Sequence, residues 1–204
     1  MDEKYTSPEE TLSEIKHLME RSSRFISLSG FSGILAGIYA LLGALAAYYF
    51  LNSTGISPGY GPSNDLLIFL FADAFIVLIL AVGTGILLTT RKAKADGNSL
   101  LDAAAKKLIV NLCIPLITGG LFCLALIYHG NTFYVAPAML VFYGLSLVNA
   151  SKYTREDVRS LGLAEVVLGL ISLFIVGHGL LFWALGFGVL HILYGAYMYF
   201  KYEK

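Results

Sequence analysis

Long apolar segments alternate with short polar ones along most of this chain. Each apolar segment approaches the roughly 20 residues that an α-helix needs to cross about 30 Å of hydrocarbon. The pattern predicts an all-α, polytopic membrane protein with six transmembrane helices. The predicted helices cover residues 25–51, 66–90, 108–128, 133–150, 158–176 and 180–200.

The connections between these segments group the helices into three helical hairpins. Residues 129–132 and 177–179 are minimal turns, and only 52–65 forms a longer loop on the same side. The first and third hairpins both contain small residues spaced four positions apart, as in Gly33-x-x-x-Gly37 and Ala184-x-x-x-Gly188. This spacing is similar to that of bacterial membrane families built from short hairpin repeats. The resemblance is limited to spacing and implies no function and no site residues. Residues 25–204 are therefore predicted to form one six-helix transmembrane bundle.

Residues 1–24 precede the bundle and predict a cytoplasmic amphipathic helix from Ser7 to Arg24. Ser7-x-x-Glu10, with Pro8 at the first helical position, is a typical helix start, and Ser99-x-x-Asp102 and Thr154-x-x-Asp157 repeat this capping pattern. The N-terminal helix can lie on the inner leaflet, cover the end of its own bundle, or dock on a cytoplasmic protein partner. Its acidic polar face disfavours anionic lipid.

The basic residues fix the predicted orientation. All 14 Lys and Arg residues lie before the first segment, in the even-numbered connections, at the adjoining start of the fifth segment (Arg159) or after the last segment, and none lies on the other side. Because basic loops stay in the cytoplasm, we expect a multi-pass protein of the cell (inner) membrane with both termini cytoplasmic. Its first partner is then the lipid bilayer.

Composition agrees with this interpretation and excludes other classes. The chain is 57% hydrophobic and 14% charged, so it has too few charges to cover a soluble surface. Its net charge of zero gives no basic face for nucleic acid. Cys113 and Cys123 lie about 15 Å apart along one predicted helix, at 1.5 Å per residue, and cannot form a disulfide. No motif for a cofactor is present.

Small residues show how the helices can associate. In lipid, helices approach closely where side chains are small, and the first predicted helix is the richest in them. It is therefore either central in the bundle or a face through which a homo-oligomer forms. Its small residues are Gly30, Gly33, Ala36, Gly37, Ala40, Gly43, Ala44 and Ala47.

Candidate chemistry centres on Glu165 and His191. An ionisable group inside the membrane is costly, so each is a candidate functional residue. Both lie roughly 10 to 15 Å from the cytoplasmic side at 1.5 Å per residue, on neighbouring helices. Gly162 and Gly169 share the Glu165 face of the fifth helix, and Tyr194, Gly188 and Gly195 flank His191, so these two faces are predicted to meet.

Two interpretations of this pair stay open at the level of sequence. A carboxyl and an imidazole in a cavity form a couple that exchanges protons near neutral pH. Alternatively, they form an interhelical hydrogen bond that fastens the last hairpin. A metal site is disfavoured, because His129 and His178 lie at the outer edge, too far away to complete a ligand set.

Asp73 is the third ionisable residue inside an apolar segment. Tyr39 lies at a comparable depth on the first helix and is expected to donate a hydrogen bond to it. On the third helix Pro115 has no N–H, which frees the carbonyl of Asn111 and favours a kink.

These residues suggest two classes of function. The first is a small transporter or channel-like conduit that binds a proton, ion or solute at Glu165 and His191, with Tyr194, Asp73 and Tyr39 as further candidates. The second is a non-catalytic sensor or scaffold that binds a lipid or partner subunit and signals through the N-terminal helix. An enzyme is less favoured, since an acid and a histidine alone specify no reaction.

Overall fold

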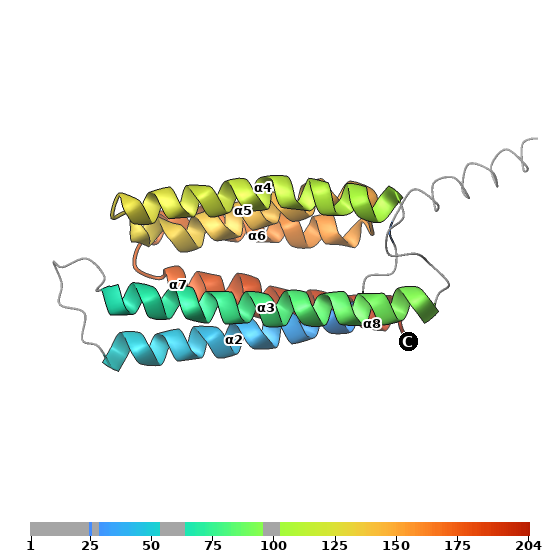
Figure 1. Ribbon diagram of the computed structural model, residues 1–204, viewed down its shortest axis with the longest axis horizontal. Helices are drawn as coiled ribbons and strands as arrows, with labels where there is room; N and C mark the ends of the chain where they lie inside the picture. The colour runs from blue at the N-terminus through green and yellow to red at the C-terminus, as the bar shows by residue number, and fades with distance from the viewer. Residues whose placement is uncertain (1–24, 26–28, 54–63, 96–102) are drawn as a thin grey trace, which may run out of the picture.

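The computed structural model describes residues 25, 29–53, 64–95 and 103–204, and every regular element in these ranges is helical (Figure 1). The predicted helix of residues 7–24 and the capping signals at Ser7 and Ser99 lie outside the described residues. The elements are α2 (Gly30–Ser53), α3 (Asn64–Ala95), α4 (Ala103–Tyr128), the 3₁₀ turns η1 (Thr132–Tyr134) and η2 (Ser151–Tyr153), α5 (Val135–Ala150), α6 (Asp157–Phe174), α7 (Gly179–Trp183), the π-helix η3 (Ala184–Leu190) and α8 (His191–Tyr202).

Five of these helical segments are long and apolar enough to cross a membrane. They are α2, α3, α4, the α5 segment with its flanking turns (Thr132–Tyr153) and the continuous α7–η3–α8 helix (Gly179–Tyr202). The sixth predicted crossing coincides with α6, which carries Asp157, Arg159 and Glu165 within 18 residues. The chain is thus compatible with a multi-pass membrane protein, and its apolar outer surface fits lipid contact.

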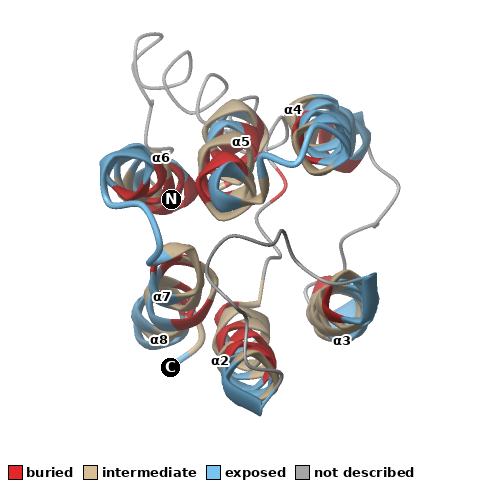
Figure 2. Cartoon of the chain, turned by 90° about the vertical axis from the view of Figure 1, so that its left-hand side faces the viewer, coloured by how far each residue is buried: buried red, intermediate tan, exposed pale blue. Residues whose placement is uncertain are grey.

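The helices form two layers. Helix α2 packs against α3 and against α8, while α5 packs against α4 and α6 (Figures 1 and 2). The layers meet where α7 and η3 contact α5 and α6. Seen end-on, consecutive helices follow one another around the bundle (Figure 2). This order is the one that short connections between antiparallel helices favour.

Glycines allow the backbones of α2 and the last helix to touch. A Cβ atom on Gly37 would lie 2.5 Å from the Gly188 carbonyl oxygen, and one on Gly195 would lie 2.5 Å from the Ile34 nitrogen. Real side chains do not fit at such distances, so this approach requires glycine. The glycines of α2 are therefore engaged within the chain, and the homo-oligomer through this helix stays a prediction.

In the layer of α4, α5 and α6, glycines likewise allow the backbones of α5 and α6 to touch. A Cβ on Gly144 would lie 2.5 Å from the Gly162 carbonyl oxygen, and one on Gly162 would lie 2.7 Å from that of Gly144. The prediction that Gly162 and Gly169 meet Gly188 and Gly195 is therefore wrong. Each glycine face packs inside its own layer, because close backbone contact there leaves the interface between layers to larger side chains.

The described Lys and Arg side chains lie at one end of the bundle, which we call the basic end: residues 91–94, 106–107, 152–159 and 201–204. Phe25 is buried here, and its backbone N–H donates to the Tyr153 carbonyl oxygen at 2.8 Å. Helix α2 consequently begins at Gly30 rather than at Phe25. The Thr154 hydroxyl donates to the Phe25 carbonyl oxygen at 2.6 Å, so it does not cap α6 as predicted.

A carboxylate joins three helices at the basic end. Glu203 Oε1 accepts the Gly30 backbone N–H at 2.6 Å and the Lys92 ammonium at 2.7 Å. A negative charge at the first N–H groups of α2 satisfies an orphan donor and complements the helix dipole. Glu203 thereby ties the end of α8 to the start of α2 and to α3.

The proline of α4 is compensated from the neighbouring helix. Pro115 lies inside α4, and the Asn149 amide of α5 donates to the Asn111 carbonyl oxygen at 2.9 Å. This is the carbonyl that the proline leaves without its helical partner. The freed carbonyl predicted from the sequence thus serves as an interhelical hydrogen-bond acceptor.

Candidate functional site

Glu165 and His191 meet between the two layers of the bundle. Glu165 is 0% exposed and His191 is 7% exposed. His191 Nδ1 lies 3.4 Å from Glu165 Oε1. The two residues come from α6 and from the first position of α8, so the sequence prediction that they form a buried pair is confirmed.

Hydrogen bonds fix the tautomer of the imidazole. His191 Nδ1 lies 3.0 Å from the Gly186 carbonyl oxygen, which can only accept, so Nδ1 carries a proton. His191 Nε2 lies 2.7 Å from the Tyr143 hydroxyl. In the neutral ring Nε2 is the acceptor, and Tyr143 donates to it. Each ring nitrogen therefore has a partner other than Glu165.

The π-helix η3 explains why the Gly186 carbonyl is available. In a π-helix the turn is wider than in an α-helix, and such segments frequently lie at functional sites. Here the segment ends immediately before His191, and the ring turns back onto the carbonyl five residues earlier. The sequence contained no specific signal for this π-helix.

Gly186 also makes room for the carboxyl of Glu165. A Cβ on Gly186 would lie 2.5 Å from Glu165 Oε2, closer than real side chains approach. The carboxyl therefore packs directly on the backbone of η3. A larger residue at position 186 would displace the Glu165 carboxyl from the backbone of η3.

Both carboxyl oxygens of Glu165 are buried without a hydrogen-bond partner in the described part of the chain. The imidazole is within ion-pair distance of Oε1, but its Nδ1–H is directed to the Gly186 carbonyl. Buried polar atoms are almost always hydrogen-bonded, and a buried carboxylate is especially costly when it is not. The site thus contains a group that can take up a proton but lacks a fixed donor.

Aromatic rings separate this site from the end of the bundle opposite the basic end. Phe187 lies 5.0 Å from Tyr143 and 6.0 Å from His191 between ring centroids, and Trp183 lies 5.2 Å from Phe187. The rings continue along the last helix from the imidazole away from the basic end. They offer no carboxylate or amine on that side of the pair.

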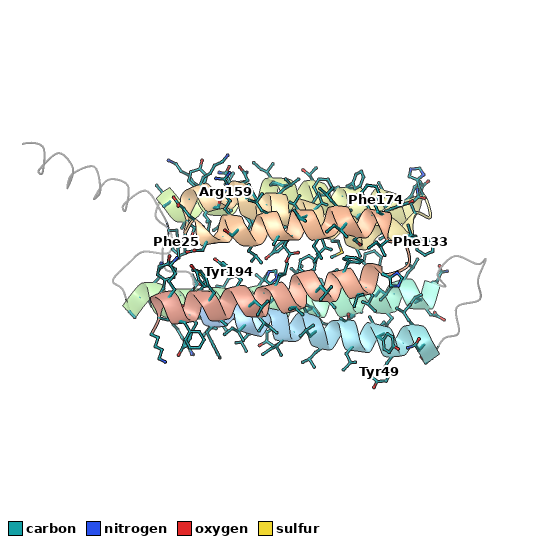
Figure 3. All side chains as sticks on the ribbon, turned by 180° about the vertical axis from the view of Figure 1, so that it is seen from behind. Phe25, Tyr49, Phe133, Arg159, Phe174 and Tyr194 are labelled. Carbon is teal, nitrogen blue, oxygen red and sulfur yellow. The ribbon has the colours of Figure 1, made fainter. Side chains whose placement is uncertain are left out.

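Tyr194 lies one turn after His191 on α8, towards the basic end, where Figure 3 shows it near Phe25 and Arg159. Its ring packs, with that of Tyr143, against the cluster of Leu147, Val158 and Leu161. Its hydroxyl oxygen is buried and has no hydrogen-bond partner among the described residues. The polar groups near the pair thus include a second phenol, Tyr194, in addition to Tyr143.

An acid surrounded by donors lies beyond Tyr194, at the start of α6. Asp157 accepts hydrogen bonds from the Tyr202 hydroxyl at 2.7 Å and from the Lys201 ammonium at 3.0 Å. The Tyr197 hydroxyl adds a third at 3.3 Å. Burial raises the pKa of the Asp157 carboxyl, but these hydrogen bonds outweigh it and hold the pKa below its usual value. Asp157 is therefore ionised at neutral pH.

Asp73 and Tyr39 do not join this site. No hydrogen bond links the two residues, although both belong to the described part of the chain, so the bond expected from their depths is not formed. The carboxyl of Asp73 instead packs against α2 where Gly43 leaves room, with Oδ2 3.1 Å from the position of a Cβ there. Two residues at the same depth on neighbouring helices can therefore point in different directions around their helices.

Tyr143 is the site residue that sequence reasoning did not assign. It is one of several polar residues of α5, with Ser146 and Asn149, and the local pattern does not single it out. Its position relative to the basic end could have identified it, because Tyr143 lies about 10 Å from the end of α5 at 1.5 Å per residue, close to the depth of Glu165.

The described residues contain no group of three or more His, Cys, Asp or Glu side chains that could hold a metal ion. No protein-family model, curated protein or solved structure matches this chain.

Proposed function

We propose that this protein crosses the cell (inner) membrane six times, with both termini in the cytoplasm, and binds a proton at Glu165 and His191 as part of transporting an ion or small solute. Five apolar helices and the position of α6 against α5 support six crossings. The gathering of described Lys and Arg residues at one end supports the orientation.

Glu165 carries the proposal. A residue that only fastened two helices would satisfy its hydrogen-bonding atoms, whereas both carboxyl oxygens of Glu165 are buried without a donor. Such a group is expensive to keep in a membrane protein and is a functional candidate for that reason. The nearest ionisable group is the His191 imidazole, and a proton moved between the two groups creates or removes both charges together.

The packing of the carboxyl favours a proton over larger ligands at this position. Glu165 lies directly against the backbone at Gly186 and beside the imidazole, with no exposed surface. A metal ion would need several oxygen or nitrogen ligands at about 2.0–2.6 Å. A proton needs only one oxygen.

The titration of Glu165 tests this function. In the full-length protein in lipid nanodiscs, infrared spectra across a pH series should show one buried carboxylic acid carbonyl band that appears as the pH falls. Glu165→Gln should remove this band and abolish proton-coupled flux in proteoliposomes, while Asp65→Asn, which changes an exposed acid at the far end of α3, should leave both unchanged. A band that persists in Glu165→Gln, or a carboxyl that never titrates, contradicts the proposal.

Cysteine labelling tests the orientation. Single cysteines at Asn131 or at Lys204 are introduced with Cys113→Ala and Cys123→Ala, so that the native thiols do not react. We expect a membrane-impermeant reagent to label Asn131→Cys from outside intact cells and Lys204→Cys only after the membrane is opened, because basic segments stay in the cytoplasm. Labelling of Lys204→Cys in intact cells would reverse the orientation.

One observation favours the sensor or scaffold as a second candidate. Phe25, which directly follows the predicted N-terminal helix, is hydrogen-bonded to Tyr153 and Thr154 in the connection that leads into α6. A change in α6 around Glu165 therefore has a short route to the N-terminal segment and to a cytoplasmic protein partner bound there. A wild-type protein whose Glu165 titrates without any proton-coupled flux would favour this candidate.

A further inference from the structure

We infer that the Glu165–His191 pair exchanges its proton with the basic end of the bundle only, and that Tyr143 and Tyr194 carry the proton along this route. The inference rests on the proposed binding of a proton by the pair. It adds a direction and two positioning residues, and in the proposed orientation it makes the cytoplasm the source of the proton.

Polar groups on the side of the basic end follow one another. The Asp157 carboxylate lies at the surface with Lys201 and two tyrosine hydroxyls around it. Tyr194 lies one turn earlier on α8 than Tyr197, whose hydroxyl donates to Asp157. Tyr143 follows, since its ring packs against the same apolar cluster as that of Tyr194, and its hydroxyl is hydrogen-bonded to His191 Nε2.

The Tyr194 hydroxyl has the property that a relay needs. It is buried within an otherwise apolar cluster and is engaged in no fixed hydrogen bond in the described structure. A hydroxyl can accept one proton and donate another, so it can pass charge without being ionised itself. A residue present only for packing would be as well served by phenylalanine.

In the opposite direction, α7 and η3 carry no titratable side chain between Gly179 and Leu190. Phe187 and Trp183 continue from the imidazole towards the far end, and neither side chain titrates. The next polar group of α6 on this side is the Ser172 hydroxyl, about 10 Å from Glu165 at 1.5 Å per residue, beyond hydrogen-bond reach. The Ser172 hydroxyl is also buried without a hydrogen-bond partner, but it does not titrate. Along the last helix, titratable side chains therefore continue from the pair towards the basic end only.

The transfer can be written with every proton assigned. It begins with a Glu165 carboxylate and a neutral imidazole protonated on Nδ1. The Tyr143 oxygen accepts a proton from the Tyr194 side and releases its own hydroxyl proton to His191 Nε2. The resulting imidazolium passes its Nδ1 proton to Glu165 Oε1, 3.4 Å away, and a neutral carboxylic acid forms. One proton has moved and Tyr143 is unchanged. The imidazole is neutral with its proton on Nε2, so in this state it gives up the Nδ1 hydrogen bond to the Gly186 carbonyl.

The titratable and charged groups that face this route come from every element packed around it. Helix α5 contributes Tyr143, and η3 contributes none. The remaining groups are Arg155 in the connection before α6, Asp157 and Glu165 on α6, and His191, Tyr194, Tyr197, Lys201 and Tyr202 on α8.

The rate of proton uptake tests the route. Full-length protein in nanodiscs is subjected to a rapid drop in pH, and the appearance of the Glu165 carboxylic acid band is followed by time-resolved infrared spectroscopy. We expect Tyr194→Phe to slow this step by roughly 100-fold, the lower end of what a positioned proton-transfer group contributes. The equilibrium midpoint should stay unchanged, because the ring and its packing remain. Tyr199→Phe, which removes an exposed hydroxyl from the same helix, is the matched control.

The outcomes separate this inference from the proposed function. If Glu165 titrates but Tyr194→Phe takes up protons at the wild-type rate, the route is wrong and proton binding stands. Equal slowing in Tyr194→Phe and Tyr199→Phe also overturns the route, since the effect would not depend on the buried hydroxyl. If Glu165 does not titrate in the wild-type protein, both the function and the route fail. A change of midpoint without a change of rate would make Tyr194 a structural residue.

Discussion

Gly195→Ala is expected to destabilise the bundle by about 1–3 kcal/mol or more, the cost of forcing an extra group into a packed interior. The added methyl would lie 2.5 Å from the Ile34 nitrogen and 2.7 Å from the Gly30 carbonyl oxygen. Both atoms belong to the backbone of α2, so no side chain can rotate away to relieve the contact. The helices α2 and α8 must separate, and a lower temperature of unfolding in detergent or nanodiscs measures the loss.

The chain supplies a matched control for this change. Gly120 of α4 has no atom within 4 Å of an added Cβ. Gly120→Ala should therefore stabilise the helix by about 0.5–1 kcal/mol, because alanine loses less backbone freedom than glycine on folding. Equal stability of the Gly195→Ala and wild-type proteins would show that α2 and α8 do not approach as described.

These two glycines show what the sequence could and could not predict about the fold. The six apolar segments were visible because each helix must cover its backbone and present apolar side chains over its whole length. Small residues indicated that helices approach closely, but not which helices. Gly195 and Gly120 look alike in a sequence, and only the arrangement of the bundle distinguishes the packed glycine from the exposed one.

The site was predictable to a similar degree. Counting residues from the basic side placed Glu165 and His191 at the same depth, and the short turn between α6 and α7 made them neighbours. The count could not give the direction of each side chain around its helix. This is why Asp73 and Tyr39, also matched by depth, do not contact each other, and why Tyr143 was not assigned to His191.

Local signals near helix ends were the least reliable. Thr154-x-x-Asp157 has the form of a capping box, yet Thr154 donates to the Phe25 carbonyl, which lies 129 positions earlier in the chain. A hydroxyl bonds to the best-placed acceptor, whether this acceptor is local or distant. The π-helix before His191 likewise has no signal in the pattern of apolar and polar residues along its own helix.

Glu165→Met is expected to make the protein more stable and to abolish proton binding. The carboxyl is fully buried and without a hydrogen-bond donor, and an unsatisfied buried polar group costs about 1–3 kcal/mol. Methionine fills a similar volume with an unbranched, flexible side chain. No partner is left unpaired, because His191 keeps its hydrogen bonds to Gly186 and Tyr143. A gain in stability with a loss of activity is typical of a group retained for function.

Tyr143→Phe in the same site should have the opposite effect on stability. It removes the 2.7 Å hydrogen bond to His191 Nε2 and leaves this nitrogen buried without a donor. A change of tautomer would not recover this loss, since Nδ1 would then lose its hydrogen bond to the Gly186 carbonyl. We expect a loss of about 1–2 kcal/mol, as for other hydrogen bonds between membrane helices.

The free energies of unfolding of Glu165→Met and Tyr143→Phe are both measured in the same lipid nanodiscs, at a pH where the wild-type protein is most stable. If Glu165→Met lost as much stability as Tyr143→Phe, the role of Glu165 would be to stabilise the packing of α6 against the last helix. The proposed proton site would then have no physical basis.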